Sequence, residues 1–225
     1  MTLTLGISLL VAGLAIAVLG VLVYGSASIH SGFYVKAVCK RDDEAVSLTF
    51  DDGPDPEMTP KVLEVLRRHG VKATFFVIGE KVQAHPEIVR QIVEEGHSIG
   101  SHSWSHDWRT NLGFAIEHSE QIRKALLAIK DACGVTSGMY RPPMGVTTPH
   151  LRTAVRWTRV KVIGWNVRSF DTVMKRSREE VAAKVIAKTR PGSIILLHDR
   201  LQEADRLADM IISGLKEKGF EFKAL

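Results

Sequence analysis

Residues 45–79 read AVSLTFDDGPDPEMTPKVLEVLRRHGVKATFFVIG. The apolar run at 45–50 predicts a strand that ends in two aspartates and Gly53-Pro54. Residues 60–69 predict an amphipathic helix that begins with a proline and stops at Gly70, and residues 71–78 predict a second strand. A strand, a helix and a strand in this order form a parallel crossover unit.

The same alternation continues towards the C-terminus. Further helices are expected over 87–95, 114–132, 179–188 and 203–218, and further strands over 97–100, 161–166 and 193–197. This pattern predicts an α/β fold with a parallel sheet, either barrel-like or doubly wound. Sites in such folds lie at the carboxyl ends of the strands, so polar residues there are the first candidates.

The composition is that of a globular protein with one domain of catalytic size. The chain has 225 residues, of which 45% are hydrophobic and 24% charged, and these values exclude wholesale disorder. Thirty Lys and Arg against 25 Asp and Glu give a net charge of +5, which suits anionic partners without selecting one. Two cysteines are too few for a disulfide framework or a cysteine-rich zinc site.

The N-terminus predicts a transmembrane helix. Residues 2–35 contain no Lys, Arg, Asp or Glu, and the apolar run 5–24 has the length that spans a bilayer, with no polar face. A cleaved signal peptide is the alternative, although no basic residue precedes the run. We therefore expect residues 1–30 to form an uncleaved anchor with a short linker, and residues 31–225 to form the catalytic domain.

Two clusters carry metal-site chemistry. Asp51 and Asp52 repel each other at the end of a strand, and a cation bound by one of them would leave the other free to take a proton. An ordinary Asp-Gly turn is the alternative. His102 and His106 are four residues apart, which predicts one face of a helical turn within reach of a single ion. Two imidazoles, one carboxylate and open positions are typical of catalytic zinc sites.

Three further segments place ionisable residues after predicted strands. In RPPMG (141–145) two prolines stiffen a loop that suits an oxyanion donor, or that is simply a turn. WNVRSFD (165–171) and IILLHD (194–199) supply an aspartate and a histidine. His198 is either a general acid or a solvated loop residue, and a paired aspartate would favour its charged form.

Taken together and in this order, these segments resemble the polysaccharide deacetylase family, also described as the NodB-homology domain of carbohydrate esterase family 4. The resemblance covers about residues 44–220 and includes GVKATFFVIG (70–79) and GHSIGSHSWSH (96–106) between the motifs. It implies a distorted (β/α) barrel, here preceded by one N-terminal transmembrane helix, and metal-dependent hydrolysis of N-acetyl groups on sugars.

The resemblance also implies roles for individual residues. By this resemblance, Asp52, His102 and His106 bind a divalent metal, usually zinc. Asp51 is the base and is held by Arg141, and His198 is the acid and is paired with Asp171. The backbone N–H of Met144 is the oxyanion donor, and Pro143, Met144 and Leu196 contact the substrate, with Leu196 lining the acetyl pocket. Two motifs depart from the family pattern. Met144 replaces an aromatic residue, and Arg168 and Thr172 replace an aspartate and a tryptophan, so the wall of the substrate groove is expected to differ.

The expected function is deacetylation of N-acetylated envelope glycans, either N-acetylglucosamine-type polymers or lipid-linked sugars. Hydrolysis of another non-peptide amide bond and an inactive glycan-binding module are the alternatives. The basic residues that follow the apolar run, Lys36, Lys40 and Arg41, would place the domain in the cytoplasm, but acetylated glycans lie outside and we expect it there. No nucleic-acid partner is expected, because the basic segment 152–161 predicts a solvated helix face. The sequence leaves the oligomeric state open.

Overall fold

A seven-stranded parallel sheet is the centre of the structure, a computed structural model that describes residues 2–173 and 175–225. The strand order is β5-β4-β3-β2-β1-β7-β6. The strands are β1 (Ser47–Gly53), β2 (Thr74–Val77), β3 (Ser98–Ser101), β4 (Met139–Tyr140), β5 (Lys161–Val162), β6 (Val167–Arg168) and β7 (Ile194–His198).

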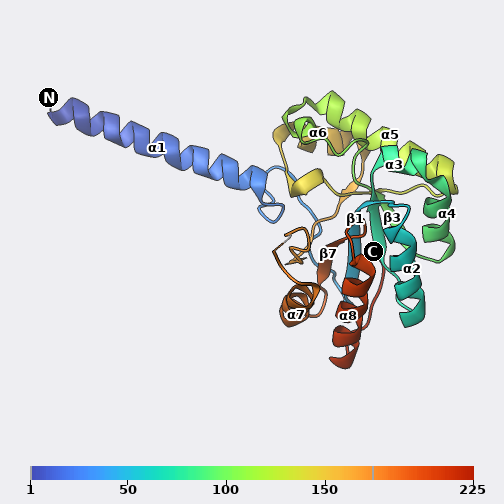
Figure 1. The fold of residues 1–225 in the computed structure, drawn as a ribbon. Coiled ribbons are helices and arrows are strands. Elements are labelled where there is room, and N and C mark those ends of the chain that lie inside the picture. The colour runs from blue at the N-terminus through green and yellow to red at the C-terminus, as the bar shows by residue number, and fades with distance from the viewer. Residues whose placement is uncertain (1, 174) are drawn as a thin grey trace.

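Helices surround the strands in Figure 1. They are α2 (Met58–His69), α3 (Gly79–Ala84), α4 (Pro86–Glu94), α5 (Ala115–Cys133), α6 (Pro149–Thr158), α7 (Arg178–Lys188) and α8 (Ala204–Glu217), with short 3₁₀ turns η1 (Trp108–Leu112) and η2 (Pro143–Gly145). The largest core cluster joins β1 and β2 to α2, α4, α7 and α8. All seven residues of β1 are buried, as expected for a central strand of a parallel sheet.

The two edges of the sheet curl towards each other. Strands β5 and β6 stand at opposite ends of the strand order, yet only residues 163–166 link them. At 3.8 Å per residue, this link limits the Cα atoms of Val162 and Val167 to a separation of at most about 19 Å. Residues 38–40 bridge the gap, because Val38 pairs with Ile163 and Lys40 with Ser193. The predicted distorted (β/α) barrel is confirmed, with its wall open between β5 and β6.

Most of the predicted elements are present, with ends shifted by at most three residues. The strand expected over 161–166 is wrong, because only residues 161–162 form a strand, β5, and residues 163–166 are the link to β6. In that link the carbonyls of Ile163 and Gly164 accept hydrogen bonds from the buried Arg141 side chain. The sequence analysis also missed α3, α6 and the two-residue strands β4 and β6.

Helix α1 (Thr2–Ala27) points away from the rest of the molecule (Figure 1). Its segment Gly6–Ala27 is long and apolar enough to cross a membrane, a test that a signal sequence also passes. Its C-terminal end is attached to the barrel. The Thr147 N–H donates to the Ser26 carbonyl at 3.0 Å, and the Thr147 hydroxyl donates to the Gly25 carbonyl at 2.9 Å. Just beyond the helix, Ile29 is 3% exposed and packs in a core cluster with Trp165 and Leu196.

Candidate metal and active site

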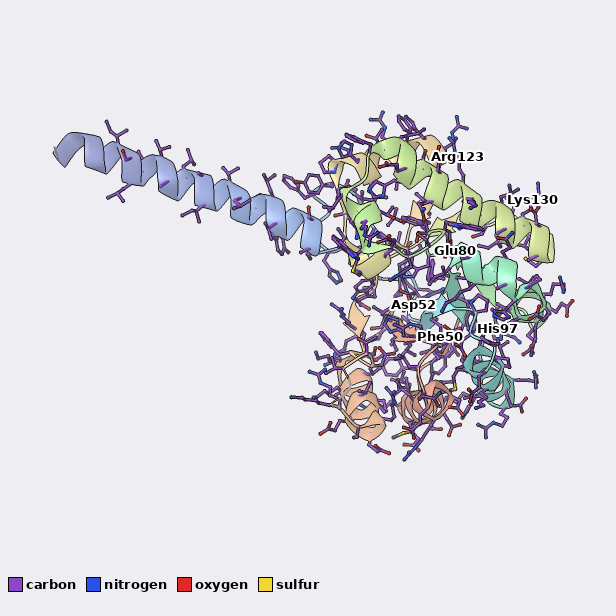
Figure 2. The ribbon with its side chains drawn as sticks, turned by 45° about the horizontal axis from the view of Figure 1, so that its top comes forward. Phe50, Asp52, Glu80, His97, Arg123 and Lys130 are labelled. Atoms are coloured by element: carbon purple, nitrogen blue, oxygen red, sulfur yellow. The ribbon has the colours of Figure 1, made fainter. Side chains whose placement is uncertain are left out.

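Two adjacent carboxylates lie at the carboxyl end of β1, in the middle of the domain, where Figure 2 labels Asp52. Successive side chains of a regular strand point to opposite faces. Here the register with β2 shifts between Asp51 and Gly53, and Asp52 has a φ of +73°. This irregularity lets both carboxylates, which are buried, face the same group of histidines.

The second carboxylate forms a candidate metal centre with two imidazoles. Asp52 Oδ1 lies 3.4 Å from His102 Nε2 and 3.3 Å from His106 Nε2, and one ligand atom from each residue lies within 4.8 Å of the others. Asp52 Oδ1 is a buried carboxylate oxygen without a hydrogen-bond partner in the described structure. Two imidazole nitrogens and one carboxylate oxygen suit zinc and similar divalent ions. The residues present therefore fit such a cation.

A loop, and not a helix, brings the two histidines together. The helical turn expected over 102–106 is wrong, because Ser103 and His106 have φ values of +68° and +54°. The Ser103 hydroxyl accepts from the His106 N–H, and Gln121 on α5 accepts from the N–H groups of residues 104 and 105. Serine hydroxyls that compete for backbone hydrogen bonds disfavour a helix, and the two serines in HSWSH were the signal for this.

The hydrogen bond of one imidazole and the lowered pKa of the other suit metal ligands. His102 Nδ1 lies 2.8 Å from the carbonyl oxygen of Arg141. A carbonyl can only accept, so Nδ1 carries a proton, and in the neutral ring Nε2 is the nitrogen whose lone pair can face the centre. Burial, followed by the nearby charge of His102, lowers the pKa of His106. The lowered pKa favours the neutral form of His106, which is the form that binds metals.

Asp51 is fixed by a buried arginine. Arg141 Nη1 donates to Asp51 Oδ1 at 2.7 Å, and the guanidinium lies 4.2 Å from the centre of the Phe76 ring. The Arg141 side chain is fully buried and also donates to the Thr49 hydroxyl and to two backbone carbonyls. The other oxygen, Asp51 Oδ2, lies 3.7 Å from His102 Nε2. One oxygen is thus held by Arg141 while the other faces the candidate metal centre.

His198 at the end of β7 forms an equally specific pair. Its Nδ1 lies 2.8 Å from Asp171 Oδ1, and its backbone N–H donates to Asp171 Oδ2 at 2.8 Å. Burial by itself lowers the pKa of His198, but the hydrogen bond and charge of Asp171 outweigh it and the net pKa is raised. The imidazolium form is thereby favoured, as a general acid requires.

The remaining predicted residues lie in the loop after β4 and in β7. Met144 in η2 has a φ of +58°, and its side chain is half exposed, whereas Pro143 is buried. Leu196 is buried two residues before His198, so both side chains point to the same face of β7. Of the two tryptophans beside the histidines, Trp104 packs beneath Lys124 and Trp108 is exposed.

Two residues that the sequence analysis did not single out contact the site. Arg200 Nε donates to Asp52 Oδ2 at 2.8 Å. Asp199 is fully buried beside Gly53 and accepts from the Thr59 hydroxyl at 2.6 Å, and burial raises its pKa to about 7. Both follow His198 directly in the chain, and this position was the only signal for them.

A parallel (β/α) barrel with a candidate Asp-His-His metal centre at the carboxyl ends of its strands is typical of metal-dependent barrel enzymes. Comparison with known proteins identifies the family. Residues 39–163 match the sequence model of the family described as polysaccharide deacetylase. The chain belongs to the polysaccharide deacetylase family, the NodB-homology domains of carbohydrate esterase family 4, and the resemblance seen in the sequence is confirmed.

Individual relatives agree with this assignment. The peptidoglycan-N-acetylglucosamine deacetylase PgdA of Listeria monocytogenes is 37% identical over 182 residues, which are 81% of this chain and 38% of that protein. A chitooligosaccharide deacetylase of Bradyrhizobium is 34% identical over 80% of this chain and 89% of its own. The structure of the peptidoglycan deacetylase PdaC from Bacillus subtilis has a TM-score of 0.74 at 32% identity, covering 82% of this chain and 89% of that one. The chain thus spans well under half of the Listeria protein.

Proposed function

We propose that this protein is a membrane-anchored, zinc-dependent deacetylase of N-acetylated envelope glycans. The observation that carries the proposal is the buried, unpartnered Oδ1 of Asp52, which lies between two imidazole nitrogens and next to the Arg141-bound Asp51. The names of the relatives, which are deacetylases of peptidoglycan and chitooligosaccharides, support the substrate class.

The proposed reaction is hydrolysis of the acetamido C–N bond. Zinc held by Asp52, His102 and His106 would supply a Lewis acid that polarises the acetyl carbonyl and makes water more acidic. Asp51 takes the proton of the attacking water on Oδ2, because Arg141 holds Oδ1 in place.

The other residues act on the oxyanion and on the leaving group. The Met144 backbone N–H, fixed in η2 between prolines and Gly145, donates to the developing oxyanion. Protonated His198 gives its proton to the departing amine, so the products are acetate and a free amino sugar. Leu196, on the same strand face as His198, lines the space for the acetyl methyl group, and Pro143 and Met144 border the sugar.

We propose the same division of the chain as from the sequence, with residues 1–30 as anchor and linker and residues 31–225 as the deacetylase domain. The bonds from Thr147 to the carbonyls of Gly25 and Ser26 support an uncleaved anchor, since cleavage near residue 27 would remove both acceptors. The domain faces the outside, where acetylated glycans lie. A C-terminal reporter that is active only outside the cytoplasm tests this, and a silent reporter on a stably produced fusion would reverse the orientation.

The first experiment measures acetate release by the full chain in detergent from N-acetylglucosamine oligomers. Release that stops with a chelator and returns with zinc is the expected result. A folded, zinc-loaded protein that releases no acetate from any N-acetylated glycan contradicts the proposal. Activity on small amides alone would assign the chain to a different amide hydrolase on the same scaffold.

A further inference from the structure

A cavity of about 310 Å³ lies between the end of α1 and the candidate active site. One side is formed by the residues that end and follow the helix, among them Ser28 and His30. The other side is formed by Met144, Arg168, Phe170 and, from the end of α7, Lys188. None of the roles proposed above uses this cavity.

The cavity borders the site where the acetyl group would react. Met144 lines the cavity, and its backbone N–H is the proposed oxyanion donor. Phe170 lines it too, and the next residue, Asp171, binds His198. A group in the cavity would therefore be part of the same substrate molecule, next to the sugar that carries the acetamido group.

The lining is basic. Arg168 and Lys188 are exposed cations, and among the residues that the structure describes no carboxylate lines the cavity and neither cation forms an ion pair. The Arg168 guanidinium lies 5.0 Å from the centre of the Phe170 ring, and Arg176 lies 5.2 Å from the same ring. Stacking of this kind holds a guanidinium in place while its N–H groups remain free for an anion.

The position of the cavity indicates where that anion comes from. Its wall is formed by residues 27–30, directly after the proposed membrane span Gly6–Ala27, so it lies at the bilayer surface if α1 crosses the membrane. We infer that the cavity binds the phosphate of a lipid-linked N-acetylated sugar, with the sugar at the metal site and the lipid in the bilayer. This inference rests on the proposed function and names its substrate class.

The test compares two lipids that differ in the group between the sugar and the polyprenol, which is charged in one and neutral in the other. N-acetylglucosamine is joined to the same short polyprenol through a diphosphate or through a neutral glycosidic bond, and the full chain is placed in phosphatidylcholine nanodiscs. The wild type should have a kcat/KM at least about tenfold higher for the diphosphate, the range expected for a charged contact with two cations. Replacing both cations, by Arg168→Gln with Lys188→Gln, should bring the ratio close to one.

Lys184→Gln is the matched control. Lys184 is exposed on α7, one turn before Lys188, and does not line the cavity, so the same loss of charge should leave the ratio within about twofold. Equal use of the two lipids by the wild type would overturn the inference, and so would an equal ratio in the double variant and the wild type. If added phosphatidylglycerol abolishes the preference, the cavity binds a phospholipid headgroup and the inference is wrong.

A binding measurement separates this inference from the proposed function. The Asp51→Asn chain is titrated with both lipids, and tighter binding of the diphosphate that is lost in the double variant supports the cavity without any turnover. If the wild type hydrolyses neither lipid nor any oligomer, the deacetylase function fails, and the binding ratio still decides the cavity.

Discussion

Arg200 Nε donates to Asp52 Oδ2 at 2.8 Å, while Oδ1 of the same carboxylate faces the two histidines. The arginine therefore occupies one oxygen and leaves the other to a cation. This arrangement directs Asp52 towards binding a metal through one oxygen only. Mutation of a residue that hydrogen-bonds to a metal ligand and orients it typically lowers metal affinity by about 10- to 100-fold.

Arg200→Ala should therefore weaken zinc binding by about 10- to 100-fold, because the Asp52 carboxylate is then free to rotate. Competition with a chromogenic chelator measures the affinity. Arg206→Ala on α8, an exposed arginine bonded to Glu179 and Glu203, is the matched control. Tighter zinc binding in Arg200→Ala would contradict the positioning role, since it would mean that repulsion between the guanidinium and the cation dominates.

The two adjacent aspartates should separate metal binding from turnover. Asp52→Ala should abolish stoichiometric zinc binding because it removes the proposed carboxylate ligand, which lies 3.4 Å and 3.3 Å from the two imidazole nitrogens. Asp51→Asn should keep the zinc and lower kcat by about 10²- to 10⁴-fold, the usual contribution of a positioned base. Zinc content after dialysis and acetate release are measured on both variants. Normal turnover in Asp51→Asn would remove Asp51 from the role of base.

Removal of Asp171 should change the pH profile. The acid His198 must be protonated, so activity is lost as the pH rises through its pKa, which Asp171 raises. Asp171→Asn removes that charge and lowers the pKa, so the alkaline limb of kcat/KM should move to lower pH. The profile of Asp131→Asn, an exposed site at the end of α5, should match the wild type. An unmoved alkaline limb in Asp171→Asn would assign that limb to another group.

His97 should make the fold sensitive to acid. Its Nδ1 accepts from the Ala73 N–H at 3.1 Å, and burial, followed by the charge of Lys72, lowers its pKa to about 4. The pKa of this histidine is lower in the folded chain than in the unfolded chain, where it is near 6.5. Its contribution to stability is therefore complete above about pH 6.5 and is lost as the pH falls towards the pKa of the folded state.

The free energy of unfolding should accordingly fall between pH 6.5 and 4, with a contribution from His97 approaching about 1.4 kcal/mol per pH unit. Urea unfolding of the wild type and of His97→Gln measures the difference, and the variant should have the smaller slope. Parallel pH dependences would show that other groups cause the acid sensitivity.

Gly53 should tolerate no side chain. A Cβ at this position would lie 2.3 Å from Asp199 Oδ2 and 2.7 Å from Oδ1, in a fully buried contact. Gly53→Ala should lower the free energy of unfolding by about 2 kcal/mol or more, as overpacking of this kind does. Gly138→Ala, where nothing lies within 4 Å, is the control in urea unfolding. Equal stability of the two variants would show that Asp199 moves aside without cost.

Local patterns in the sequence were enough to predict the alternation of strands and helices, since apolar periodicity reflects burial directly. The grouping of Asp52 with His102 and His106 was implied by the family resemblance, and the structure brings the three side chains together. The loop conformation of the histidine segment was not predicted, and part of it rests on a tertiary contact, because Gln121 of α5 accepts from the N–H groups of residues 104 and 105. The bond from Arg200 to Asp52 likewise depends on tertiary structure and joins residues 148 positions apart.

Arg141 connects the proposed catalytic base to the wall of the barrel. Two of its donors bind the carbonyls of Ile163 and Gly164, in the segment that crosses the open side of the barrel, and a third binds Asp51. The residue proposed to hold the base thus also stabilises the segment that closes the barrel wall. A relative that lost catalysis through replacement of Arg141 would also lose these two hydrogen bonds to the barrel wall. Other contacts would then have to stabilise the segment 163–166.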